Sequence, residues 1–220
     1  MFASALQAQK PFQNGQAARA VVGQITFTQG SAVPSQQVLG GASGLAWAGN
    51  RLYVADSNRI AASPQDHRVL VFDTTQIPGP YTDITIDNAV FSRPYCFLCG
   101  SPAGLSLGQD TFDPPTITSG STTTQAFYSG RNGTQDPSSG ASPAEHAWFN
   151  NATAVATDGV RFAVADTDNN RVLLWRTPPS STNQNPDLVL GQPDFATVQQ
   201  QTLGVVTATG RSSTVMLAIT

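Results

Sequence analysis

The side chains with the clearest capacity for chemistry are two cysteines in the phrase Cys96-Phe-Leu-Cys99. This spacing suits a redox pair, half of a zinc site or a structural disulfide. A complete zinc site needs more ligands, and the only two histidines, His67 and His146, do not stand at metal-ligand spacing from the cysteines. Haem attachment requires a histidine directly after the second cysteine, where this chain has Gly100. We expect a structural disulfide between Cys96 and Cys99, with free thiols and a metal or redox role as the alternatives.

A second candidate is the series Asp166, Asp168 and Asn170, which alternates like the start of a calcium-binding loop. Such a loop continues with glycine and closes with glutamate, whereas here Arg171 follows and no glutamate closes it. The sequence also lacks the nucleophile elbow Gly-x-Ser-x-Gly, the zinc motif His-Glu-x-x-His and a phosphate-binding loop. The single glutamate, Glu145, lies in a polar, low-complexity stretch. The sequence therefore predicts no catalytic residue, no metal ligand and no cofactor site.

A short phrase, apolar-Gly-Gln-x-x-Phe, recurs three times along the chain. Its glycine–glutamine pairs are Gly23-Gln24, Gly108-Gln109 and Gly191-Gln192, so the copies lie 85 and 83 residues apart. A phrase that returns at nearly constant distance indicates a repeat architecture.

A longer phrase lies between these copies and occurs twice. It holds an apolar run, a glycine turn, a run that ends in Val-Ala-Asp, and an Arg-Val-Leu run that ends in an aromatic residue. The Val-Ala-Asp runs end at Asp56 and Asp166, and the Arg-Val-Leu runs begin at Arg68 and Arg171. The turns are Gly49-Asn50 and Asp158-Gly159, which favour tight hairpins.

Each repeat therefore predicts four antiparallel strands, the unit of a propeller blade. The predicted strands are Leu45–Ala48, Arg51–Ala55, Arg68–Phe72 and Leu105–Gln109, then Thr153–Thr157, Arg161–Ala165, Arg171–Trp175 and Leu188–Gln192. We predict one further outer strand, Ala20–Gln24, without inner strands of its own. The expected fold is all-β, a β-propeller of four-stranded antiparallel blades with about two blades plus flanking strands, which is an incomplete ring.

At these residues the chain resembles the NHL-repeat family of β-propellers. The phrase Asp166-Thr-Asp-Asn-Asn-Arg-Val172 matches the family pattern Asp-x-x-Asn-x-Arg-Val at Asp166, Asn169 and Arg171. In the first repeat Asp56 and Arg68 are 12 positions apart instead of 5. The Leu-Gly-Gln-Pro-Asp-Phe phrase is similar to that of long bacterial secreted NHL-repeat proteins.

The resemblance implies a secreted or periplasmic, non-catalytic module that recognises protein, peptide or glycan through its loops. Two other functions stay open. The chain is either a fragment of a propeller lyase or lactonase whose metal ligands lie in missing blades, or a subunit of a larger assembly or filament.

The remaining segments predict the domain organisation. Residues 1–18 read as a leader or the remnant of a signal peptide, because Ala5-Leu-Gln-Ala8 resembles a signal-peptidase site. Residues 19–220 form the partial propeller, with a cysteine-containing loop at 78–102 and a low-complexity insertion at 113–145. Two Asn-x-Thr phrases, at Asn132 and Asn151, match the glycosylation pattern.

The composition limits the partners. The net charge is −3 and there is no basic footprint, so we expect no nucleic acid partner. No run of 18 apolar residues occurs, so we expect no membrane span. Two blades cover one face of each other and leave two faces bare, so we expect self-association that completes the propeller.

Overall fold

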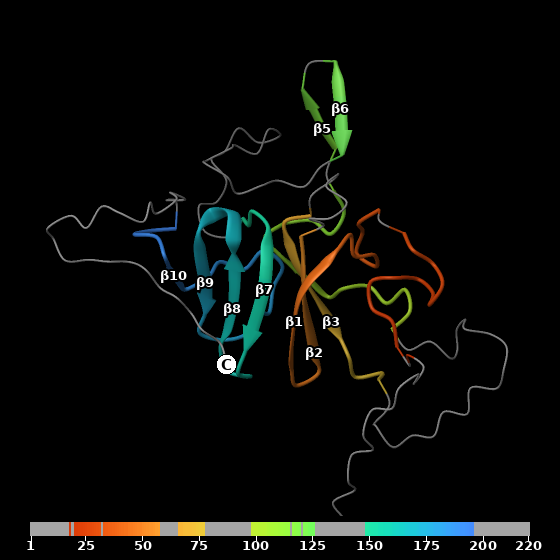
Figure 1. Ribbon diagram of the computed structural model, residues 1–220, viewed down its shortest axis with the longest axis horizontal. Coiled ribbons are helices and arrows are strands. Elements are labelled where there is room, and N and C mark those ends of the chain that lie inside the picture. Colours follow the sequence, from red (N-terminus) through yellow and green to blue (C-terminus); the bar gives the residue numbers. More distant parts are fainter. Residues whose placement is uncertain are drawn as a thin grey trace, which may run out of the picture.

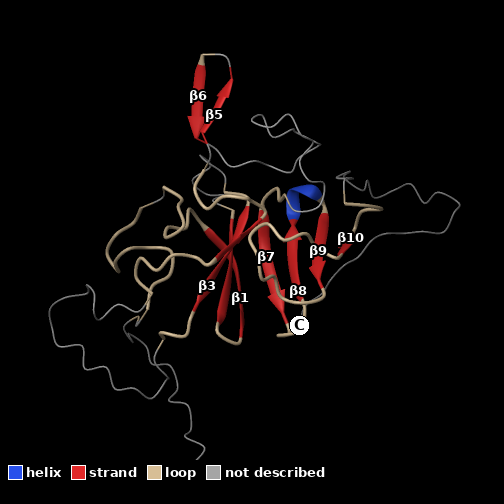
Figure 2. Ribbon diagram, turned by 180° about the vertical axis from the view of Figure 1, so that it is seen from behind, coloured by secondary structure: helices blue, strands red, loops and turns tan. Residues whose placement is uncertain are grey.

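The computed structural model describes residues 18, 20–31, 33–57, 66–77, 98–114, 116–119, 121–125 and 148–195. This part of the chain is all-β, with two four-stranded antiparallel sheets and one two-stranded sheet (Figure 1). Within these residues the only helical element is a single 3-10 turn, η1 (Thr167–Asn169), drawn in blue in Figure 2. The predicted all-β class is confirmed.

The two large sheets have the same internal order. In the first sheet, neighbouring strands follow the chain as β1 (Ala42–Ala48), β2 (Arg51–Asp56), β3 (Arg68–Asp73) and β4 (Leu105–Leu107). The second sheet likewise contains β7 (Ala152–Thr157), β8 (Phe162–Asp166), β9 (Arg171–Trp175) and β10 (Leu188–Leu190). All eight predicted strands are confirmed, with ends that shift by a few residues.

Glycines with a left-handed backbone end the outer strands earlier than predicted. Gly108 has a φ of 81° and Gly191 a φ of 89°, so β4 and β10 end at Leu107 and Leu190. The strand predicted at Ala20–Gln24 is wrong, because this segment pairs with no strand of the described sheets. Only Ala20 forms an isolated bridge, and the segment from Val22 to Thr28 consists of bends.

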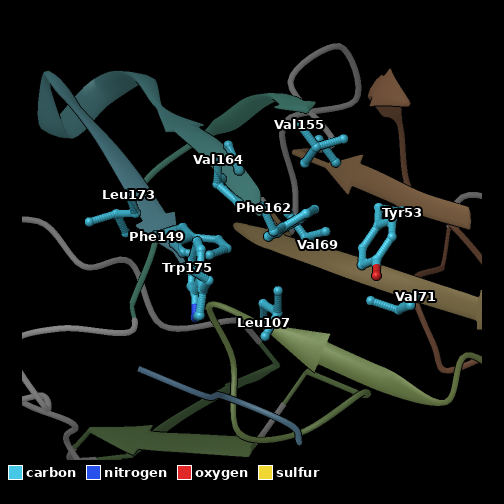
Figure 3. Packing of buried hydrophobic residues seen from close by; sticks show 12 residues of the cluster. Tyr53, Val69, Val71, Leu107, Phe149, Val155, Phe162, Val164, Leu173 and Trp175 are labelled. Atoms are coloured by element: carbon cyan, nitrogen blue, oxygen red, sulfur yellow. The ribbon is translucent and has the colours of Figure 1, made fainter. Parts of the chain in front are cut away.

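The main hydrophobic core lies between the two sheets (Figure 3). Tyr53 of β2 and Phe162 of β8 meet across the interface with ring centroids 4.6 Å apart. Trp175 packs against Phe162 at 5.6 Å and edge-on against Phe149 at 6.4 Å. Val69, Val71 and Leu107 of the first sheet join Val164 and Leu173 of the second in the same cluster.

The inner strands β1 and β7 approach each other closely at this interface (Figure 1). A β-carbon on Gly44 would lie 2.8 Å from the α-carbon of Ala154 and 2.9 Å from the carbonyl oxygen of Thr153. Only glycine fits such a backbone approach. The glycine that opens the first long phrase therefore sets the distance between the sheets.

The other face of the first sheet carries a smaller cluster. Val54, Leu70 and Phe72 are buried there against Val22 and Leu39. The segment before β1 thus covers the outer half of this face. Val22 and Leu39 thus pack on the first sheet at the positions where Leu107 and Phe149 pack on the second sheet.

The predicted insertion at 113–145 contains a hairpin of its own. Strands β5 (Thr116–Ser119) and β6 (Thr122–Gln125) pair only with each other among the described elements and project away from both sheets (Figures 1 and 2).

Candidate functional site: two buried aspartate–arginine clamps

The residues that carry the repeat motif gather at one end of each sheet. In the second repeat, Asp166 ends β8 and Arg171 begins β9, and the two residues are paired across the strands. The Nε of Arg171 donates to the carboxylate of Asp166 at 2.7 Å. Both side chains are almost completely buried, so this ion pair is shielded from water.

The same guanidinium also binds two backbone carbonyls from distant segments. Its Nη2 donates to the carbonyl of Trp148 at 2.9 Å, and its Nη1 donates to the carbonyl of Phe195. Asp166 in turn accepts from the backbone N–H of Asn150 at 2.6 Å. The pair therefore joins β8 and β9 to the segment that enters β7 and to the phrase that follows β10.

The first repeat contains the same arrangement. Arg68 donates to Asp56 at 2.8 and 3.0 Å, to the carbonyl of Val38 at 3.0 Å and to the carbonyl of Phe112. Asp56 accepts from the backbone N–H of Gly41 at 2.9 Å. We call each such pair, with the backbone groups that it binds, a clamp. The first clamp is built on Asp56 and Arg68, and the second on Asp166 and Arg171.

The clamps explain why three phrases repeat together. The Val-Ala-Asp run supplies the carboxylate, the Arg-Val-Leu run supplies the guanidinium, and the phenylalanine of Gly-Gln-x-x-Phe supplies a carbonyl. Arg171 binds backbone carbonyls together with the aspartate of its own repeat. The aspartate of each clamp accepts a backbone N–H from the segment that precedes the first strand of its sheet.

The glutamines of the Gly-Gln pairs complete two of the turns. Gln192 donates its amide to the carbonyl of Asn170 at 3.1 Å, and Gln109 donates to the carbonyl of His67 at 3.4 Å. Gln24 differs, since its amide pairs with the backbone of Ser31 at 2.8 and 3.1 Å.

The two clamps differ at one position, two residues before the arginine. In the second repeat this residue is Asn169, whose amide donates to Asp166 at 2.9 Å. In the first repeat it is Asp66, which is fully buried with no hydrogen bond of standard geometry to either carboxyl oxygen. Burial and the neighbouring Asp56 raise the pKa of Asp66 to about 8, against the weaker opposing effect of Arg68.

The residue directly before each clamp arginine has the same backbone conformation in both repeats. His67 and Asn170 adopt left-handed conformations, with φ values of 46° and 53°. Burial lowers the pKa of His67 to about 4, against the opposing charge of Asp168. The neutral ring accepts the backbone N–H of Asn151 on Nδ1 at 2.9 Å, which links the first clamp to the second repeat.

Two of the clearest sequence candidates have no chemical role that the structure reveals. Asp168 accepts from the amide of Asn151 at 3.2 Å, and no group of three His, Cys, Asp or Glu side chains gathers anywhere in the described ranges. Asn151 is buried with a φ of 62°, so the folded chain does not present its amide for glycosylation. Asn132 lies outside the described residues.

Cys99 is buried in a turn tied to the N-terminal segment, because Gly100 donates to the carbonyl of Gln24 at 2.8 Å. Cys96 lies outside the described residues, so the disulfide stays a prediction.

Sequence reasoning missed Asp66 and His67. The signal that would have found them is their fixed position before the arginine, which aligns them with Asn169 and Asn170 once the seven extra residues of the first repeat are set aside.

No family model, curated protein or solved structure matches the chain. In the described residues, no helix is both long and apolar enough to cross a bilayer.

Proposed function

We propose that the chain is an NHL-type segment of a secreted β-propeller and that it serves as a non-catalytic scaffold recognising protein, peptide or glycan through its loops. The observation that carries this proposal is the duplicated clamp. The two four-stranded sheets have the same strand order, and each clamp makes the same four contacts. These are the aspartate–arginine pair, two bonds from the arginine to backbone carbonyls and one bond from a backbone N–H to the aspartate. This is the behaviour of a modular unit rather than of a unique active site.

The burial of the clamps argues against catalysis by these residues. A catalytic aspartate or arginine must reach a substrate, whereas Asp56, Arg68 and Asp166 are fully buried. Their polar atoms are directed at one another and at backbone groups. The charged side chains of the clamps therefore hold the chain in place.

The end of the sheets opposite the clamps supplies the proposed recognition surface. There the β7–β8 turn exposes Val160 and Arg161, and Asp158 fixes the turn by accepting both of their backbone N–H groups, at 2.8 and 2.6 Å. The β1–β2 turn lies at the same end, where Arg51 donates to the carbonyl of Pro179 at 2.7 Å. Rigid turns that present exposed side chains are suited to binding.

The test is a binding screen of the full chain against a glycan array and a random-peptide display library. We expect a ligand whose affinity falls about tenfold or more in Val160→Asp or Arg161→Ala, as for residues at an interface centre. Asp110→Ala, an exposed change next to the clamps, should leave binding intact. Equal affinity in all three variants would contradict the assigned surface. A stoichiometric metal in the purified chain, together with lyase or lactonase turnover, would contradict the scaffold itself.

A further inference from the structure

The side of the second sheet that faces away from the first is apolar, and no described strand packs on it. Side chains alternate between faces along a strand, and Phe162 and Val164 point into the core, so Ala163 and Ala165 point the other way. The register places Ala156 beside Ala163 and Ala154 beside Ala165 on that face. Ala154 is exposed and the other three are partly exposed. We call these four alanines the alanine face.

The equivalent positions of the first sheet show what such a face accommodates. Aligning the two long phrases places Ala154, Ala163 and Ala165 at the positions of Gly44, Tyr53 and Ala55. Tyr53 and Ala55 are at most 1% exposed, because the second sheet packs on them. The equivalent surface, which has Tyr53 in place of Ala163, is thus buried in the first sheet and partly exposed in the second.

The residues of the second sheet that pack on this surface of the first sheet also have counterparts in the first sheet. The second sheet enters the interface through Val155 and Phe162, whose counterparts in the first sheet are Leu45 and Leu52. Leu45 is 65% exposed and its neighbour Trp47 is 58% exposed. Both point away from the second sheet, on the face that carries Val54. We call Leu45 and Trp47 the leucine–tryptophan edge.

Within the described residues, the counterparts of both halves of the internal interface are therefore exposed, on opposite sides of the stack. Resting on the proposed modular scaffold, we propose that the leucine–tryptophan edge of a second copy of this chain docks on the alanine face. Val22 and Leu39 already cover Val54, Leu70 and Phe72 of the first sheet, so the contact involves the inner strand β1 of one copy and β7 and β8 of the other. Such a head-to-tail contact propagates into a ring or a filament.

One detail sets the strength of the contact. Inside the chain, Gly44 permits the close approach of β7, whereas the equivalent position on the alanine face is Ala154. Its methyl group holds a docked strand further away. The contact between copies is therefore weaker than the contact between sheets, and Ala154→Gly should strengthen it.

The experiment is sedimentation velocity of the full chain over a range of concentrations. We expect wild type to form oligomers, Ala163→Glu and Trp47→Asp each to sediment as monomers, and Ala154→Gly to assemble at several-fold lower concentration. Val33→Asp, which removes an exposed apolar residue outside both surfaces, is the matched control and should assemble like wild type.

A mixture of the two monomeric variants gives the sharpest result. The Ala163→Glu chain keeps an intact leucine–tryptophan edge and the Trp47→Asp chain keeps an intact alanine face, so together they should form a heterodimer and nothing larger. A monomeric wild type, or oligomers that survive Trp47→Asp, would overturn the proposal. A monomer with both clamps intact would leave the proposed scaffold function standing, so the two failures are distinguishable.

Discussion

At the scale of single residues, the difference between the two clamps is an acid in the place of an amide. Asn169 donates to Asp166, whereas Asp66 must hold a proton to stand beside Asp56 in the same way. A folded pKa of about 8 lies far above the unfolded value, so the folded chain binds a proton that the unfolded chain releases. Stability from this group is present at low pH and is lost as the pH rises towards 8.

The pKa of the neighbouring His67 shifts in the opposite direction, so its effect on stability has the opposite pH dependence. The pKa of His67 is lowered to about 4, so its contribution is present above about pH 6.5 and is lost as the pH falls towards 4. The two effects oppose each other between pH 4 and 6.5. Above that range the loss from Asp66 is no longer offset by His67.

We therefore expect Asp66→Asn to stabilise the protein at neutral and alkaline pH. Wild type should lose about 1–2 kcal/mol of unfolding free energy between pH 6.5 and 8, at roughly 1.4 kcal/mol per pH unit for one proton. The variant should not show this loss. Urea denaturation at several pH values measures it.

Asn169→Asp is the converse variant, because it places an acid beside Asp166. It should destabilise the protein at pH 7 and steepen the same pH dependence. Equal slopes in wild type and Asp66→Asn would show that Asp66 is ionised in the folded chain.

The arginines are predicted to be the most sensitive residues of the described chain. Arg171→Met removes the charge partner of the buried Asp166 carboxylate and the guanidinium donor of two carbonyls, which should cost about 3–5 kcal/mol. Arg171→Lys should recover little, because an ammonium group cannot reach the aspartate and both carbonyls with one planar fork. Arg176→Met, at an exposed arginine nearby, should change stability by no more than about 0.5 kcal/mol. Chemical denaturation compares the three variants, and equal stabilities of Arg171→Met and Arg176→Met would contradict the clamp.

At the scale of elements, glycine fixes how β4 ends and meets the next repeat. Gly108 is left-handed, and a β-carbon there would lie 2.7 Å from the carbonyl oxygen of His67 and collide with the ring of Phe149. Gly108→Ala should therefore cost about 3–5 kcal/mol, from backbone strain and overpacking together.

Gly159→Ala separates these two causes. Gly159 has a similar φ of 85°, but nothing lies within 4 Å of its added β-carbon. This variant should cost only about 1–2 kcal/mol of backbone strain. Thermal denaturation measures the loss of stability in both variants. Equal losses would show that Gly108 is not packed against the next repeat.

The cysteine loop gives a further prediction at this scale. We expect Cys96 and Cys99 to be oxidised in chain from an oxidising compartment, since small loops of secreted proteins are stapled in this way. Thiol titration of the unfolded protein without reductant should then find about zero free thiols. Two free thiols with bound zinc would reverse the expectation.

Much of the element structure was predictable from the sequence, for a physical reason. The strands of both repeats combine runs of β-branched and apolar residues with turn residues at fixed places, such as Gly49-Asn50 and Asp158-Gly159. The exception was Ala20–Gln24, where no described strand pairs with the segment and Val22 packs against the first sheet instead.

The candidate site was less accessible to sequence reasoning. The aspartate and arginine positions were predicted from their repetition, but their partners are backbone carbonyls at Val38, Trp148, Phe112 and Phe195. Any residue supplies a carbonyl, so no side-chain pattern marks these partners. The pairing becomes visible only once the fold brings the segments together.

At the scale of the whole molecule, the described part of the chain is a stack of two units with the same topology. In the internal interface, Val155, Phe162 and Val164 of the second sheet pack against Tyr53, Val69 and Val71 of the first. The side chains of the two units differ at many positions. The pairs Gly44 and Ala154, and Asp66 and Asn169, are the ones with consequences for assembly and for pH dependence.

The central claim is that both units are held by the same buried clamp, and nuclear magnetic resonance of the arginine Nε–H groups tests it most directly. Arg68→Lys and Arg171→Lys assign the two signals. The account predicts two Nε–H signals that exchange slowly with solvent, because each group is buried and donates to an aspartate at 3.0 or 2.7 Å. Rapid exchange of both signals, at the rate of the exposed Arg161 and Arg176, would contradict it.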